Sequence, residues 1–100
     1  MRPSESQVRA IARARLAKVA AMGEWVWERL TPDERVDITL VDRVRALPQE
    51  QRDELSVRAG CKSVPSEDTW EAFATWISTQ VKIERSRQGY YGNPLGRRSA

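Results

Sequence analysis

Residues 4–30 read SESQVRAIARARLAKVAAMGEWVWERL and contain no proline. Ser4 is a favourable N-cap, and Gln7, three residues later, completes a capping box. Ala, Arg, Leu and Lys dominate the stretch, and all four have high helix propensity. The sequence therefore predicts one long helix over residues 5–30. It leaves open whether the helix continues through Gly23, because Gly weakens a helix interior by about 1 kcal/mol relative to Ala.

Apolar side chains recur on two sides of this predicted helix. The larger stripe has helical spacing and is expected to face the core; it consists of Val8, Ile11, Ala12, Val19, Met22, Val26 and Leu30. The opposite side carries only small residues, at spacings of four, three and four: Ala10, Ala14, Ala17 and Ala21. Such a face allows a second helix to approach closely, but alanine is also simply a good helix former.

A second helix is predicted from Pro32 to about Ala46. Thr31 is a good N-cap, Pro32 suits the first helical position, and Glu34 completes another capping box. The alternation of apolar and polar residues over 36–40 also fits a strand. The cap and the helical spacing further along favour the helix.

Two more helices follow. Pro48 begins the third, which runs to about Ala59 and stops at Gly60. Ser66 caps the fourth, which runs to about Arg87. The fourth helix has one apolar face with Trp70, Phe73, Ala74, Ile77 and Val81, and a second with Ala72, Trp76, Thr79 and Ile83. A helix that is apolar on two sides is either enclosed in a core or contributes to an interface.

The predicted fold is therefore all-α, a small bundle of about four helices with flexible basic segments at both ends. We expect one helical domain over residues 1–88, in which residues 5–22 form a basic half-helix. Residues 89–100 form a flexible tail rich in Gly, Tyr and Arg. One hundred residues are enough for a single domain only.

Charge is sorted along the chain. Residues 1–22 hold five basic residues and one acidic residue, and the chain beyond Glu84 holds four basic residues and no acidic one. The middle, residues 23–84, holds thirteen acidic and eight basic residues. Two basic ends of this kind attract a polyanion or an acidic protein surface.

The composition argues against most catalytic chemistry. The chain has no histidine, which is the usual general base and the commonest metal ligand, and Cys61 is its single cysteine. The acidic clusters, 33–37 and 67–71, fall in predicted first turns of helices, where acids stabilise the helix dipole. We therefore expect no enzyme activity, no metal and no cofactor. The chain also shows no secretory signal and no apolar run long enough to cross a membrane, so we expect a cytoplasmic protein.

Residues 47–55, LPQEQRDEL, are similar to the helix that opens region 4 of bacterial sigma factors. The resemblance implies a helix-turn-helix with a basic recognition helix next along the chain. The next predicted helix instead begins SEDTWE over residues 66–71, which is acidic. The resemblance is therefore not extended to DNA reading.

Two functions remain. The first is a non-catalytic binding protein that docks on a protein or nucleoprotein partner, like the small inhibitors and adaptors that phages and other mobile elements often encode, or that pairs with itself as a homodimer. Its candidate partner-binding residues are Trp76, Ile83, Tyr90, Tyr91, Arg97 and Arg98. The second is a nucleic-acid-binding protein that uses its basic ends on the phosphate backbone. Candidate contacts to nucleic acid or to an acidic surface are Arg9, Arg13, Arg85 and Arg87.

Overall fold

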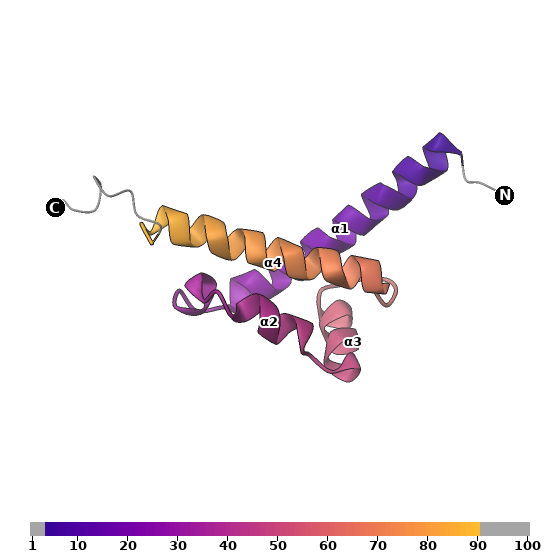
Figure 1. Cartoon of the computed structure of the whole chain (residues 1–100). Helices are drawn as coiled ribbons and strands as arrows, with labels where there is room; N and C mark the ends of the chain where they lie inside the picture. Colours follow the sequence, from indigo (N-terminus) through magenta and orange to yellow (C-terminus); the bar gives the residue numbers. More distant parts are fainter. Residues whose placement is uncertain (1–3, 91–100) are drawn as a thin grey trace.

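The computed structural model describes residues 4–90 (Figure 1). Its elements are, in chain order, α1 (Glu5–Arg29), the single 3₁₀ turn η1 (Glu34–Val36), α2 (Leu40–Arg45), α3 (Gln49–Arg58) and α4 (Glu67–Arg87). There is no strand within these residues. The predicted all-α bundle is thus confirmed, with two long helices and two short ones.

The core lies between α4 and the C-terminal half of α1, with α2 closing it from one side. In Figure 1, α4 crosses α1, while α2 and α3 lie together below them. The buried cluster consists of Val19, Met22, Leu40, Val44, Trp70, Phe73, Ala74, Ile77 and Val81. Of the two apolar faces of α4, the one that carries Phe73 and Ile77 is fully buried. Everything that α1 contributes to this cluster comes from residue 19 onward.

Helix α1 is continuous through Gly23, and the glycine serves packing. A Cβ atom at this position would lie 2.6 Å from Cε3 and 2.7 Å from Cδ2 of Trp76. The indole of Trp76 therefore rests directly on the backbone of α1. Its edge meets Trp27 at a centroid distance of 6.3 Å and an interplanar angle of 86°. Such edge-to-face pairs add stability beyond the area they bury.

The predicted helix over residues 32–46 is confirmed only in its second half, because α2 covers only residues 40–45 of it. Its capping box does form, because the Thr31 amide donates to Glu34 Oε1 at 2.8 Å and the Glu34 amide donates to Thr31 Oγ1 at 3.2 Å. Only η1 follows, however. Asp37 is extended, and its carboxylate accepts hydrogen bonds from the amide and hydroxyl of Thr39 at 2.9 and 2.7 Å. This local turn competes with the helix, so α2 is confined to the residues after it. The strand interpretation is not realised either.

The last two helices lie where the sequence predicts them. Pro48 is extended and precedes α3, and Gly60 just after α3 has a φ of 81°. Glycine adopts this left-handed conformation without steric cost. The Ser66 side chain accepts a hydrogen bond from the Thr69 amide at 3.2 Å and caps α4.

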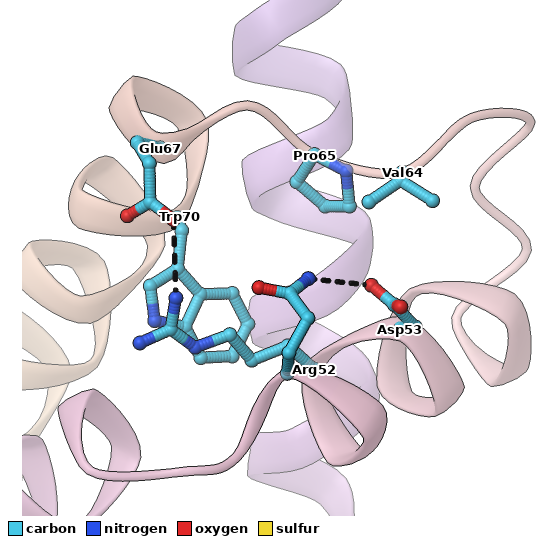
Figure 2. A pocket seen from close by; sticks show the side chains of 7 residues that line it. Arg52, Asp53, Val64, Pro65, Glu67 and Trp70 are labelled. Carbon is cyan, nitrogen blue, oxygen red and sulfur yellow. Dashed lines mark hydrogen bonds and ion pairs between the residues drawn. The ribbon is translucent and has the colours of Figure 1, made fainter.

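Arg52 ties the α2–α3 connection to α4. Its guanidinium lies over the Trp70 ring at 4.9 Å from the centroid (Figure 2). It also donates to the backbone carbonyls of Leu47 at 3.1 Å and Arg45 at 3.2 Å, and to the Glu67 carboxylate at 3.2 Å. One planar side chain thus satisfies carbonyl groups at the end of one helix and anchors the start of another.

Candidate functional site

The N-terminal half of α1 extends away from the rest of the molecule. Every residue from Ser4 to Ala17 is exposed, and burial begins only at Lys18 and Val19. Figure 1 shows this part of the helix running past the start of α4. The Cα radius of gyration is 16.5 Å, against about 13 Å for a compact domain of 100 residues. We call residues 5–17 the α1 arm.

The α1 arm carries apolar side chains that nothing covers. Val8 is 50% exposed and Ile11 is 56% exposed. By the 3.6-residue period, both lie on the same side of α1 as Met22, which is fully buried. On the C-terminal half of α1 this side faces α4, whereas the arm extends past the N-terminus of α4. We call Val8, Ile11 and Ala12 the arm stripe. The larger apolar stripe of α1 therefore packs on the core only from Val19 onward.

The arm is positively charged. Arg9 pairs with Glu5 at 3.3 Å, but both side chains are well exposed, and such pairs contribute little. Arg13 and Arg15 have no ion pair or hydrogen bond within residues 4–90. Lys18, at the base of the arm, donates from Nζ to Ser63 Oγ at 2.7 Å. The arm therefore presents unshared positive charge beside its apolar stripe.

Two open grooves flank Lys18. The larger, about 400 Å³, lies between the alanine side of α1 and the α3–α4 loop; its lining is Ala14, Ala17, Lys18, Ala21, Gly60, Cys61, Lys62 and Ser63. The smaller, about 230 Å³, is lined by Ile11, Ala14, Arg15, Lys18, Ser66 and Thr69. Burial raises the pKa of the Cys61 thiol, and the charge of Lys18 opposes this only in part. Cys61 is therefore a neutral, weakly polar part of the wall rather than a nucleophile.

The predicted partner-binding residues on α4 and just after it lie away from the α1 arm. The half-buried Trp76 packs within the chain, on Gly23 and Trp27. Ile83 is 45% exposed and Tyr90 is 52% exposed. Figure 1 shows the end of α4 pointing away from the α1 arm, so these residues and the arm do not form one surface.

The predicted arginines of this end make contacts within the chain. Arg85 donates from Nη1 to the Val36 carbonyl, and its guanidinium lies 4.3 Å from the centroid of the Tyr90 ring. Arg87 pairs with Glu84 at 3.0 Å. Of the other predicted contacts, Arg9 and Arg13 lie on the exposed α1 arm, whereas Tyr91, Arg97 and Arg98 are outside the described residues.

The acidic clusters have structural partners. The Thr31 hydrogen bonds lower the pKa of Glu34, and those from Thr39, together with Arg43, lower the pKa of Asp37. Glu71 pairs with Arg45 at 3.4 Å. Carboxylates held in their ionised form by caps are poor general acids.

The crevice beside Glu67, a carboxylate of the second acidic cluster, is too small for a ligand. The crevice in Figure 2, beside Arg52 and Trp70, has a volume of about 10 Å³, which is room for one water molecule. Within residues 4–90, no group of His, Cys, Asp and Glu side chains is placed to hold a metal ion. None of the helices described for the chain has the length and apolar character needed to cross a membrane.

The sequence did not lead us to expect that the arm stripe would be exposed, nor that Leu16 would be, at 67%. One signal was present. Arg15 lies among the stripe residues on the helical wheel, and an arginine is an unusual member of a buried stripe. A second signal was length, since the predicted α4 is shorter than the predicted α1 and leaves part of it without a neighbour.

Comparison of the sequence with protein-family models and with curated proteins, and comparison with solved structures, found no match.

Proposed function

We propose that this chain is a non-catalytic helical binding protein that docks on a protein partner through its α1 arm, in the manner of a small inhibitor or adaptor. The observation that carries the proposal is the exposure of Val8 and Ile11 on a helix that projects from its own core. An amphipathic helix with free apolar side chains at this spacing fits a hydrophobic groove on another protein.

The positive charge of the arm indicates which charges the partner's groove should carry. Arg15 lies among the residues of the arm stripe on the helical wheel and has no ion pair or hydrogen bond within residues 4–90, so an acidic residue of the partner's groove would meet it. Such complementarity speeds association and selects the partner more than it adds affinity. We therefore infer a groove with an apolar floor and an acidic rim.

A nucleic-acid partner fits this surface less well. Arg9 and Arg13 are one turn apart and can reach one backbone strand together, but they lie on the opposite side of α1 from Val8 and Ile11. Binding to a phosphate backbone would leave the apolar side chains of Val8 and Ile11 exposed to water. The arm offers apolar side chains where a duplex has none to match, apart from thymine methyl groups.

The test compares two arm variants. Val8→Ala with Ile11→Ala removes apolar surface without changing charge, whereas Arg9→Ala with Arg13→Ala removes charge and keeps the stripe. The protein and each variant are used for affinity purification from the native host, with the captured protein identified and its binding to the purified chain measured by calorimetry. We expect the apolar variant to weaken this binding by about 30-fold or more, at about 25 cal/mol for each Å² of apolar area that stays in water.

Val57→Ala is the matched control, because Val57 is an exposed valine on α3 far from the arm in sequence. It should bind as the unaltered chain does. The proposal is overturned if the apolar variant binds the partner unchanged. It is also overturned if the chain binds DNA or RNA in a salt-dependent way that only the arginine variant weakens, which would establish the nucleic-acid function.

A further inference from the structure

Helix α1 has a second uncovered surface, which runs along its whole length. The residues of this surface fall within about 120° of the helix circumference, on the side away from α4: Arg9, Arg13, Leu16, Ala17, Ala20, Glu24 and Glu28. All are exposed except the half-buried Ala20. We call this set the free face of α1.

Charge is ordered along the free face. Its arginines lie in the N-terminal half of α1 and its glutamates in the C-terminal half, four residues apart in each case. Arg13 and Glu24 have no ion pair within residues 4–90. Arg9 and Glu28 have only exposed pairs with neighbours on their own helix, at 3.3 Å to Glu5 and 3.9 Å to Arg29. The charged side chains of the free face are thus available to another molecule.

The order is symmetric about one point. Arg13 and Glu24 are equally far from the midpoint between residues 18 and 19, and so are Arg9 and Glu28. Ala17 and Ala20 are the corresponding pair nearest the centre. If two α1 helices lie antiparallel about a twofold axis at this midpoint, Arg13 of each helix meets Glu24 of the other, while Arg9 and Glu28 lie at the same height toward opposite edges of the face. A parallel pair would instead place arginine on arginine and glutamate on glutamate.

We propose that the free face of α1 binds the same face of a second copy of this chain, antiparallel and centred between residues 18 and 19. The interface is isologous, as in most homodimers. Ala17 and Ala20 let the two helix backbones approach closely at the centre, and Leu16, which is 67% exposed, packs beside them. Individual surface ion pairs are weak, so the arginine–glutamate pairs set orientation and register rather than supplying most of the affinity.

The dimer leaves the arm stripe free. Val8 and Ile11 lie about 140–160° around the helix from the centre of the free face. A homodimer of this kind could therefore still dock on a partner through both arms. Self-association goes beyond the proposed docking function, and either can fail without the other.

Charge reversal tests the pairing. Arg13→Glu would place glutamate against Glu24 of the second copy, and Glu24→Arg would place arginine against Arg13 of the second copy. Each single variant should weaken self-association by about tenfold or more, as measured by sedimentation equilibrium over a concentration series at low salt. An equimolar mixture of the two variants should form a heterodimer, because each mismatched position then meets its opposite charge. The double variant should again form a homodimer.

Arg15→Glu is the matched control, because it makes the same change in net charge on the same helix but off the free face. It should self-associate as the unaltered chain does, and circular dichroism should show the same helix content for all variants. The proposal is overturned if the unaltered chain stays monomeric at millimolar concentration. It is equally overturned if the two single variants fail to associate with each other, or if Arg15→Glu weakens association as much as Arg13→Glu.

Discussion

Replacing Gly23 by alanine should destabilise the protein, although alanine is the better helix former. The substitution gains up to about 1 kcal/mol in helix propensity. It also places a Cβ atom 2.6 Å from Cε3 of Trp76. The Trp76 ring cannot move away freely, because its edge packs against Trp27. Overpacking of this kind costs about 1–3 kcal/mol. We therefore expect a net loss of about 1 kcal/mol in the free energy of unfolding and a fall in Tm of about 4–8 °C.

The double-mutant cycle with Trp76→Ala makes this prediction sharp. Without the indole, the new methyl group meets open space, and Gly23→Ala should then stabilise the protein by about 1 kcal/mol. The sign of the effect reverses, and the coupling energy is about 2 kcal/mol. Urea unfolding followed by far-UV circular dichroism measures all four proteins, and Ala10→Gly on the exposed arm calibrates the propensity contribution in the same helix. If Gly23→Ala stabilises the protein when Trp76 is present, the close approach of α4 to α1 is refuted.

Three further predictions concern side chains outside the α1 arm. Arg52→Ala should lower the free energy of unfolding by about 2 kcal/mol, because it removes hydrogen bonds to two carbonyls and the contact with Trp70. Arg52→Lys should recover less than half of this loss, because lysine lacks the planar guanidinium. Full recovery of stability by lysine would contradict a role for the guanidinium. Because hydrogen bonds lower the folded-state pKa of Asp37, the ionised carboxylate stabilises the fold at neutral pH. This contribution is lost as the pH falls from about 4 through the lowered pKa. Asp37→Ala should therefore be less stable than the unaltered chain at pH 7, and the difference in stability should shrink as the pH falls below about 4; a difference in urea unfolding that stays constant with pH would argue against this role. Since burial raises the pKa of Cys61, its thiol should react with a disulfide reagent more slowly at pH 8 in the native chain than in urea, and equal rates would count against this account of the groove.

The ends of the helices could be predicted because short-range chemistry sets most of them. Ser4 and Ser66 each accept a hydrogen bond from the amide three residues later, and Gly60 takes the left-handed conformation that follows a helix. Each of these devices is readable within a window of four residues. The same kind of reading failed after Thr31. There, the Asp37 carboxylate offered the chain a competing turn that was as local as the cap.

The exposed arm was not predicted, because its exposure depends mainly on which helices meet, and the sequence signals for it, Arg15 and the shorter predicted α4, are indirect. The apolar stripe of α1 runs from Val8 to Met22 in the sequence, with Arg15 as its one charged member. Its burial changes only where α4 begins, and that is a consequence of how the two helices cross. The packing of Trp76 on Gly23 is of the same kind. Sequence reasoning noticed that the glycine might interrupt the helix and that the tryptophan lay on a second apolar face, but the contact that explains both joins residues far apart in the chain.

The claim on which the proposed function depends is that the chain leaves its own α1 arm uncovered. Amide hydrogen exchange, measured at a concentration where light scattering shows a monomer, tests it residue by residue. An uncovered helical arm frays and exchanges quickly, whereas a packed helix opens only with the core. We expect the amides of residues 9–17 to exchange at least about tenfold faster than those of residues 20–29. Equally slow exchange along the whole of α1 would show that the arm is covered, and would contradict the account.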